Sequence, residues 1–389
     1  MSTSAYPLAP FWSLATFKNE KTQSFGEVVH LERIESSTGK LIDVKLLEDE
    51  ANSEDQEKKD TENTSEGKAF RAGDVLFGKL RPYLSKSWLA NKEGTALGDI
   101  HVYQPNEDCD SRFLSYLVLS NEFVGLADAS STGTKMPRTE WSKISQFKVP
   151  APPRTAQCAI ADYLDHETRE IDGMHADLGE MERLLIERRR NIVKSIFSEL
   201  RESGCSYRKL GYVAQFRNGQ DTKGIEDASG DYPVYGSGGV FKRANSFLFD
   251  GPSVLFGRKG TLDKPLLVDG KFWTVDTMYY TILSQDIFPS FLHQWATTIP
   301  FEKHSTNTAL PSMTSTVLSQ LRVPVPPLSE QRRIADEIDR ETAEIDSMLE
   351  DITKLRDLLT ERRAAVISAA VTGQIDVPIS PSIKDKSHV

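Results

Sequence analysis

Two long stretches of the chain repeat apolar residues with the period of an amphipathic helix. In each stretch leucine, isoleucine or valine recurs every seven residues, and methionine or leucine follows some of these three residues later, at Met174, Met181, Met348 and Leu355. This spacing is that of the a and d positions of a coiled coil, although the core stripe of a bundle helix remains an alternative. The predicted seam consists of Leu164, Ile171, Leu178, Leu185, Ile192, Ile338, Ile345, Ile352, Leu359 and Val366.

The same two stretches form an internal duplication. At an offset of 174 residues, 157–190 overlays 331–364 without a gap, and 17 of 34 positions are identical. Chance would give about two identities, so the chain is a duplicated unit. A helix of about 45 residues is roughly 65 Å long and needs a partner, and the other copy is the obvious one. Because a pseudo-twofold axis relates the copies, we expect antiparallel pairing, with the C-terminal end returning to the first half.

The regions 1–150 and 207–323 have a different pattern, rich in Gly, Pro, aromatics and short apolar runs. The segments 73–84 and 251–262 each predict a strand that ends in a basic turn, so we expect α+β domains with irregular sheets. In both, a Val-Leu-Phe strand core runs into glycine and then cations. Such loop cations suit phosphates or guanine edges, although ordinary solvated charges are the alternative. The cations are Lys79, Arg81, Arg258 and Lys259.

A second pair of matching segments precedes the helices. Residues 130–135 (SSTGTK) and 304–309 (HSTNTA) concentrate hydroxyls and an amide just before a proline. Such groups bond phosphate oxygens or base edges, but they also make turns and helix caps. Because they recur at the same distance from the helix, a function for Lys135, Asn307 and Thr308 becomes as strong an explanation as turns and caps.

Composition and charge modify this picture only slightly. The 389 residues carry a net charge of -10, which argues against nucleic acid, but residues 47–67 alone contribute -7 and predict a solvated or disordered loop. Residues 68–150 and 207–323 are each +2. The total charge therefore does not exclude DNA.

The usual signatures of catalysis and metal binding are missing. Three separated cysteines and seven scattered histidines give no metal-ligand spacing. The glycine-rich stretch 235–240 lacks the order of a dinucleotide site or a P-loop, so a backbone turn explains it better. Asp231 to Tyr235 only faintly matches an adenine methyltransferase motif. No run of about 18 apolar residues or secretory signal occurs, which predicts a cytoplasmic protein without a membrane span.

The residues that organise the two copies resemble one family, the specificity subunit of type I restriction-modification systems. The resemblance rests on PVPPLSEQRRIADEIDRETAEID with LLTERRAAVISAAVTGQID, and on PAPPRTAQCAIADYLDHETREID with LLIERRRNIVKSIF. FGKLRPYL, YPVYGSGGV and VLFGRKGTLDKPLLVDGKFWTVDTMYY are similar to the family's target-recognition segments. It covers nearly the whole chain. The departures are the acidic segment 47–67 and Arg154-Thr155-Ala156 in place of Leu328-Ser329-Glu330.

The resemblance implies a division of labour. Two target-recognition domains, 1–152 and 205–326, each recognise half of a split site in double-stranded DNA. Two helices, 153–204 and 327–376, set the gap between the halves and dock methyltransferase subunits, two copies by expectation, and 377–389 form a tail. A motor and nuclease subunit completes the enzyme. S-adenosylmethionine, ATP and Mg²⁺ belong to those partners, and no catalytic residue, metal or cofactor is expected here.

Two further hypotheses remain open. A coiled-coil scaffold whose terminal domains bind proteins or glycans would show no duplex binding, whereas DNA affinity falls steeply between about 50 and 200 mM salt. An enzyme, such as a solitary nuclease or methyltransferase, would show turnover by the purified chain. Under the DNA hypothesis, the expected contacts are Lys79, Arg81, Lys135, Arg258, Lys259, Asn307 and Thr308.

Overall fold

A computed structural model of the chain describes residues 4–42, 67–305 and 311–377. The chain divides into two compact units, which are described separately. Unit 1 consists of residues 1–178 together with 354–389, and unit 2 of residues 179–353. Most of the acidic segment 47–67 lies outside the described residues; its last residue, Gly67, begins a strand.

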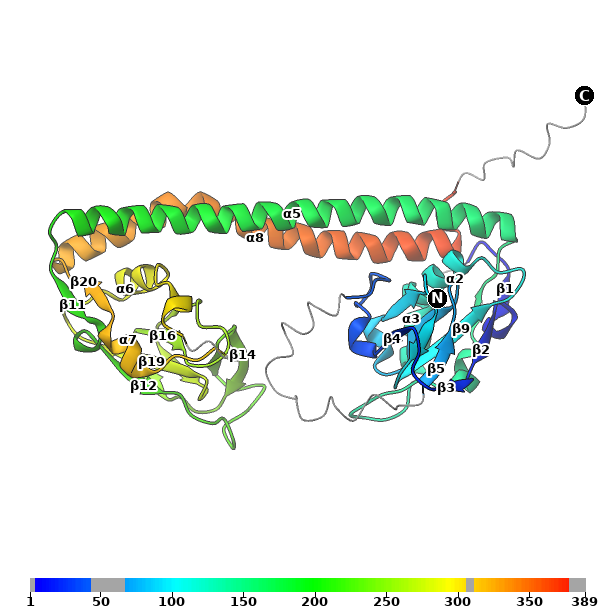
Figure 1. Ribbon diagram of the computed structural model, residues 1–389, viewed down its shortest axis with the longest axis horizontal. Coiled ribbons are helices and arrows are strands. Elements are labelled where there is room, and N and C mark those ends of the chain that lie inside the picture. Colours follow the sequence, from blue (N-terminus) through cyan, green and yellow to red (C-terminus); the bar gives the residue numbers. More distant parts are fainter. Residues whose placement is uncertain (1–3, 43–66, 306–310, 378–389) are drawn as a thin grey trace, which may run out of the picture. The chain divides into compact units, whose positions relative to one another are not determined.

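Unit 1 combines short strands, three small helices and parts of two long helices (Figure 1). Its elements in chain order are β1 (Leu8–Pro10), η1 (Phe11–Ser13), β2 (Ala15–Lys18), β3 (Lys21–Thr22), β4 (Glu27–Val29), η2 (Leu31–Arg33), β5 (Gly67–Phe70), β6 (Val75–Gly78), η4 (Pro82–Leu84), β7 (Ser87–Leu89), β8 (Gly94–Ala96), β9 (Ile100–Pro105), α2 (Ser111–Leu119), α3 (Asn121–Ala129), α4 (Trp141–Ile144), β10 (Lys148–Pro150) and the start of α5 (Arg154–Glu202).

Unit 2 repeats this order with small differences. Its elements are the end of α5, β11 (Tyr207–Lys209), η5 (Leu210–Tyr212), β12 (Ala214–Asn218), β13 (Tyr232–Gly236), β14 (Gly239–Ala244), β15 (Phe249–Asp250), β16 (Ser253–Gly257), β17 (Leu266–Val268), β18 (Lys271–Thr274), β19 (Met278–Leu283), α6 (Pro289–Ala296), η6 (Phe301–Lys303), α7 (Ser315–Gln320), β20 (Arg322–Pro324) and the start of α8 (Leu328–Thr372), whose end belongs to unit 1.

The sheets of the two units have matching strand orders. A four-stranded antiparallel sheet runs β2-β9-β6-β7 in unit 1 and β12-β19-β16-β17 in unit 2. A two-stranded sheet, β1-β10 or β11-β20, joins the beginning of each domain to the strand before its long helix. The strands predicted from Val-Leu-Phe are the inner strands β6 and β16, and every residue of both is buried.

The remaining sheets differ at one edge. Both contain a parallel pair, β4 with β8 and β13 with β18. In unit 1 the fourth strand, β3, extends the far edge beside β5, whereas in unit 2 β14 extends the edge beside β13 as a hairpin. The glycine-rich stretch 235–240 is the turn of this hairpin, so the prediction of a backbone turn is confirmed.

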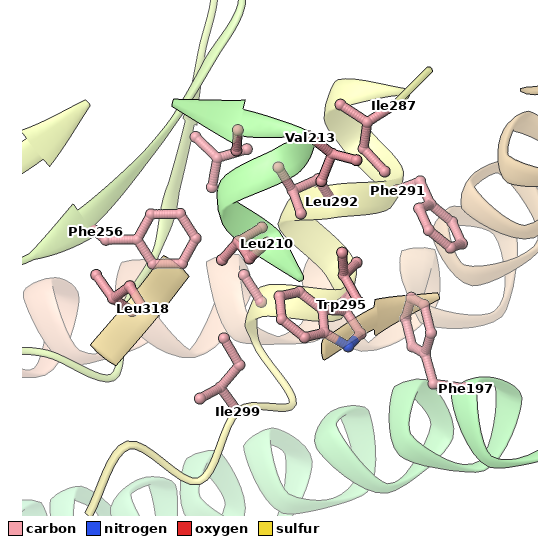
Figure 2. Packing of buried hydrophobic residues seen from close by; sticks show 14 of the residues in the cluster. Phe197, Leu210, Val213, Phe256, Ile287, Phe291, Leu292, Trp295, Ile299 and Leu318 are labelled. Atoms are coloured by element: carbon pink, nitrogen blue, oxygen red, sulfur yellow. The ribbon is translucent and has the colours of Figure 1, made fainter. Parts of the chain in front are cut away.

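The core of each unit includes both long helices. In unit 2, Phe197 of α5 packs on Phe291 of α6, with ring centroids 5.3 Å apart, and the cluster extends to Phe256 and Leu318 (Figure 2). In unit 1 Leu164 of α5 and Ile367 of α8 are both buried in the core beneath the sheet domain. Since apolar burial is the dominant stabilising term, each sheet domain depends on helical residues that are distant in sequence.

The long helices begin and end where the sequence provides stop signals. Each starts directly after a Pro-Pro pair, which cannot continue a helix on its N-terminal side. Helix α8 ends before Gly373, whose φ of 75° is left-handed, and the amide of Gln374 donates to the Ala369 carbonyl at 2.8 Å. This is the geometry of a glycine C-cap.

The two helices run antiparallel in each unit. In unit 1 the start of α5 meets the end of α8, because Arg362 contacts Glu167 and Arg363 contacts Asp172. In unit 2 the end of α5 meets the start of α8, because Arg189 contacts Asp346. Arg363 and Arg189 are equivalent in the repeat, as are Asp172 and Asp346. The predicted α+β fold class with its antiparallel, pseudo-twofold repeat is therefore confirmed.

The predicted seam has two columns of residues: the first recurs every seven residues, and the second lies three residues after it. The structure agrees with the first column and differs in the second. The residues at seven-residue spacing, from Leu164 to Val366, are buried or half-buried. However, Met174, Met181, Met348 and Leu355 are exposed, so their assignment to the seam is wrong. The buried or half-buried neighbours come four residues after the first column instead of three, and many of them are polar. They include Thr168, His175, Arg189, Thr342, Arg356 and Arg363.

Hydrogen bonds and ion pairs explain why polar residues occupy the second column of the seam. Hydroxyl groups on the seam bond within their own helix, as Thr168 does to the Leu164 carbonyl at 2.7 Å, and Arg189 and Arg363 bond carboxylates of the facing helix. A buried polar group with such partners is tolerated. Hydrophobicity alone favours the methionines beside this column. Within the described residues, no helix has the length and apolar character needed to cross a bilayer.

Candidate nucleic-acid interface

The loop that follows β6 is joined to the hydroxyl-rich segment before the helix. The amide of Arg81 donates to the Pro137 carbonyl at 2.8 Å, and the amide of Thr139 donates to the Lys79 carbonyl at 3.0 Å. The structure thus brings Lys79, Arg81 and the 130–139 segment with Lys135 to one face of unit 1. Arg81 and Lys135 are exposed.

Unit 2 builds the same junction with the same bonds. The amide of Gly260 donates to the Pro311 carbonyl at 3.1 Å, and the amide of Met313 donates to the Arg258 carbonyl at 3.0 Å. Arg258 and Lys259 therefore lie beside the segment 311–313. The predicted residues Asn307 and Thr308 lie outside the described residues.

The shared bonds define which positions correspond. Lys79 matches Arg258 because their backbone amides make equivalent bonds. The Lys79 amide donates to the Asp99 backbone carbonyl at 2.9 Å, and the Arg258 amide donates to the Thr277 backbone carbonyl at 2.8 Å. Arg81 then matches Gly260. Both have left-handed backbones, with φ of 50° at Arg81 and 82° at Gly260. A non-glycine residue in this conformation costs energy and often marks a functional site.

Asp99 determines which cations of the unit 1 loop are free. Its carboxylate accepts two bonds from the Arg138 guanidinium, at 3.0 and 2.8 Å, and lies 3.7 Å from the Lys79 ammonium. These cations, Arg138 above all, lower the pKa of Asp99. Lys79 is thus partly neutralised within the protein. By contrast, Arg81 and Lys135 have no ion pair with any described residue and are the better candidates for a phosphate or a base.

The interior beneath this loop holds a buried histidine. His101 on β9 is 3.0 Å from the Tyr103 hydroxyl through Nδ1, and its ring packs on Phe17. Burial, followed by the nearby charges of Lys68 and Lys79, lowers the pKa of His101 to about 3. The histidine is therefore neutral at physiological pH and supports the loop without a charge of its own.

In the loop of unit 2 the Arg258 side chain makes an aromatic contact. The Arg258 guanidinium lies over the Tyr279 ring, 6.0 Å from its centroid, and donates to the Asp276 carbonyl at 3.3 Å. Lys259 is exposed and has no ion pair with any described residue. Arg258 is half-buried, so Lys259 is the more accessible cation.

The β13–β14 hairpin extends the candidate face of unit 2. The Ser237 hydroxyl in its turn would lie 3.8 Å from a Cβ placed on Gly260. Along the outer strand, Val240 and Phe241 are 53% and 54% exposed and are followed by Lys242, which pairs with Glu226 at 2.8 Å. From the sequence, this stretch was interpreted as a turn and, together with residues 232–234, as similar to a target-recognition segment. The available signal was its unusual row of glycines flanked by aromatic and basic residues.

Among the described residues, no three His, Cys, Asp or Glu side chains are placed to hold a metal ion. Of the stretch Asp231 to Tyr235, which faintly matches an adenine methyltransferase motif, residues 232–235 lie in the strand β13. The arrangement can present cations, hydroxyls and aromatic rings to a ligand.

Fold and site together define a class of protein: a duplicated chain in which two sheet domains, each with an exposed basic loop, share a pair of antiparallel helices. Residues 26–182 and 202–355 both match the family model described as type I restriction modification DNA specificity domain. The chain belongs to this family.

Relatives match shorter parts of the chain. The type I restriction enzyme EcoDI specificity subunit of Escherichia coli is 30% identical over 139 residues, which is 35% of this chain and 28% of that protein. The EcoBI specificity subunit of Escherichia coli is 36% identical over 63 residues, 16% of this chain and 13% of that protein. The chain therefore matches less than a third of either relative's length.

One solved structure is similar over nearly the whole chain. It comes from work on complex assembly and conformational transition of the type I R-M system, has a TM-score of 0.58 and is 16% identical. It covers 96% of this chain and is itself covered completely. At this level of identity the similarity establishes the fold.

Proposed function

We propose that this chain is the DNA-recognition subunit of a type I restriction-modification complex. Each sheet domain recognises one half of a split duplex site through the loop after its inner strand, β6 or β16. The observation that supports this most directly is the repeated junction of that loop with the segment before the helix, which presents cations from both domains of a chain in a DNA specificity family.

Partners carry the chemistry in this proposal. Methyltransferase subunits bind S-adenosylmethionine and modify the site, and a motor and nuclease subunit uses ATP and Mg²⁺. Two methyltransferase copies fit the duplication, because each end of the helix pair repeats the other. This chain itself binds and orients DNA and catalyses no reaction.

Selection from random duplexes tests recognition by the full-length chain. The bound pool should contain two short defined blocks separated by a gap of arbitrary sequence, and affinity should fall steeply between about 50 and 200 mM salt. Purification with a methyltransferase partner and mapping of the modified bases should give the same two blocks. Turnover by the chain alone, or capture of a protein or glycan without duplex binding, would contradict the proposal.

Single substitutions then assign each block to a domain. Arg81→Ala and Lys135→Ala should weaken or relax the first block only, and Arg258→Ala and Lys259→Ala the second only. Lys148→Ala and Arg322→Ala are matched controls, because these exposed cations are repeat-equivalent and lie on β10 and β20. Relaxed preference marks a base contact, whereas uniform loss marks a phosphate contact. An equal loss of binding in the control variants would show that these loop cations do not assign the blocks to the domains.

A further inference from the structure

Arg363 of α8 connects the helix pair to the sheet domain of unit 1. Its guanidinium donates to the Asp172 carboxylate of α5 at 2.7 Å and to the Thr38 carbonyl of the sheet domain at 2.9 Å. The side chain is only 8% exposed. Lys40, two residues after Thr38, contacts the second oxygen of Asp172 at 2.8 Å. The segment 37–40 is therefore fastened to both helices.

The same segment holds the far end of the candidate DNA loop. The amide of Ser37 donates to the Ser85 carbonyl at 2.9 Å. Ser85 ends the turn that begins at Arg81, and the amide of Leu84 donates to the Arg81 carbonyl at 2.9 Å. Arg363 is thus linked to the loop Lys79–Ser85 in two steps. Its hydrogen bond reaches Thr38, and the neighbouring residue Ser37 bonds Ser85 at the end of the loop.

Backbone strain is concentrated along this connection. Among the described residues, only three non-glycine residues have positive φ: Ser37 at 63°, Arg81 at 50° and Ser85 at 50°. Such conformations cost energy and persist only where surrounding contacts hold them. The hydrogen bond to the Pro137 carbonyl holds the backbone of Arg81. The hydrogen bond between the Ser37 amide and the Ser85 carbonyl holds the other two residues.

We propose that Arg363 is a positioning residue for DNA recognition by the first domain. By holding the segment 37–40, it keeps the Lys79–Ser85 loop in the conformation that presents Arg81. This inference rests on the proposed function, since it concerns recognition of the first half-site by that loop. Arg363 itself acts through the segment and need not touch the DNA.

The duplication supplies a matched control. Arg189 is the repeat-equivalent of Arg363 and bonds Asp346, the equivalent of Asp172, at 2.7 Å. Among the described residues its guanidinium makes no hydrogen bond or ion pair with the second sheet domain, and its side chain is 25% exposed. Both arginines therefore pair the helices, but only Arg363 also fastens a loop segment.

Hydrogen exchange in the full-length chain tests the positioning role without DNA. In Arg363→Met, which keeps the aliphatic volume, the amides of Ser37, Leu84 and Ser85 should exchange about tenfold faster or more, because their bonds open locally. Arg189→Met should leave these amides unchanged. Unchanged exchange in Arg363→Met, or an equal rise in both variants, would overturn the proposal. If Arg363→Met does not fold, Asp172→Asn against Asp346→Asn makes the same comparison with milder changes.

Duplex selection provides the second readout. Arg363→Met should relax base preference in the first block about tenfold and leave the second block unchanged, and Arg363→Lys should restore part of it. Arg189→Met should change neither block selectively. Selective loss at the second block, or none, would contradict the positioning role. A wild-type chain that binds no duplex would instead reject the proposed function, while the exchange rates would still decide whether Arg363 holds the loop.

Discussion

Arg81 occupies a position where its own duplicate has glycine. The shared hydrogen bonds align it with Gly260, and both residues have left-handed φ. Glycine adopts this conformation readily, whereas in a residue with a Cβ it is disfavoured by a steric clash with the backbone. An exposed arginine at such a position contributes little to folding, so the proposed function assigns its guanidinium a contact with DNA.

Changing Arg81 to glycine should therefore move stability and binding in opposite directions. Arg81→Gly removes the steric cost and should stabilise the chain by about 1 kcal/mol. It should also weaken binding of the first half-site by about tenfold, through the lost cation. Urea unfolding and duplex titration measure the two effects.

Arg81→Ala is the matched control, because alanine keeps the strain and removes the charge. It should lose the same affinity without any gain in stability. An Arg81→Gly variant that binds DNA as tightly as the wild type would show that the arginine is not a contact.

His101 should make stability depend on pH. Its folded-state pKa of about 3 lies below the unfolded value near 6.5, so the unfolded chain binds more protons between these pH values. The stability contributed by neutral His101 is complete above pH 6.5 and is lost as pH falls toward 3. Between pH 7 and 5 this loss is about 2 kcal/mol.

Replacement of His101 by glutamine isolates this contribution, because glutamine can still bond the Tyr103 hydroxyl but does not titrate. Urea unfolding at pH 7 and pH 5 should show a smaller pH-dependent loss in His101→Gln than in the wild type. An identical loss in both chains would mean that other groups cause the acid sensitivity.

At the residue scale, the sequence predicted which cations lie on the loop but not which of them are paired with a carboxylate. Lys79 and Arg81 follow a predicted strand, yet only the fold shows that Asp99, 20 residues later, partly neutralises the first. Arg138 was missed for the same reason. Pairing between segments far apart in the chain decides which charge is free, and no local pattern encodes it.

Among the elements, the junction between each long helix and its domain depends on one buried glutamine. Gln331 accepts the Phe288 amide at 2.7 Å and donates to the Asp286 and Pro326 carbonyls, both at 2.8 Å. Gln157 repeats this at the start of α5, with the Asp110 amide and the Asp108 and Pro152 carbonyls. Each glutamine fixes the direction in which its helix leaves the sheet domain.

Replacing Gln331 with leucine should destabilise unit 2 strongly. Three backbone groups, one buried and two partly buried, would lose their side-chain partner, at a cost of about 1 kcal/mol each, so we expect about 3 kcal/mol. Denaturant unfolding measures this change. Gln320→Leu, at an exposed glutamine of the same unit, should stay within about 0.5 kcal/mol. A similar small effect of Gln331→Leu would show that water replaces the lost bonds.

Sequence analysis identified the elements better than their contacts. The long helices and the inner strands were evident because apolar period and Pro-Pro or glycine signals agree with the fold. The glutamines were visible as identical repeat positions but were not interpreted. Met174 and Met181 were misassigned because the true seam neighbours, such as Thr168 and Arg189, are polar and make specific bonds. The hairpin edge of unit 2 has no counterpart among the described residues of unit 1, so the duplication could not predict it.

At the scale of the whole molecule, the duplication requires each sheet domain to use both helices. Unit 1 takes the start of α5 and the end of α8, and unit 2 takes the remaining parts. Neither domain's core is complete without residues contributed from beyond its own sheet region, such as Ile367 in unit 1 and Phe197 in unit 2. The helices are therefore part of both cores as well as the connection between them.

If the helix pair sets the gap between half-sites, its length should be convertible into base pairs. Residues 174–180 of α5 and 351–357 of α8 lie, in each helix, between the residues of the two repeat-equivalent ion pairs. Deleting both segments removes one heptad from each helix and preserves the seam register. The helices shorten by about 10 Å, which corresponds to about three base pairs.

Rotation makes this prediction more demanding than a change of distance. Removing a heptad turns a helix by only about 20°, whereas three base pairs turn duplex DNA by about 100°. The shortened chain should therefore prefer a gap about three base pairs shorter but bind it more weakly than the wild type binds its own site, because DNA or protein must twist to compensate. Duplex selection with the double deletion measures the preferred gap, and circular dichroism checks that the variant is folded. A folded variant that keeps the original gap would show that the helices do not determine the spacing.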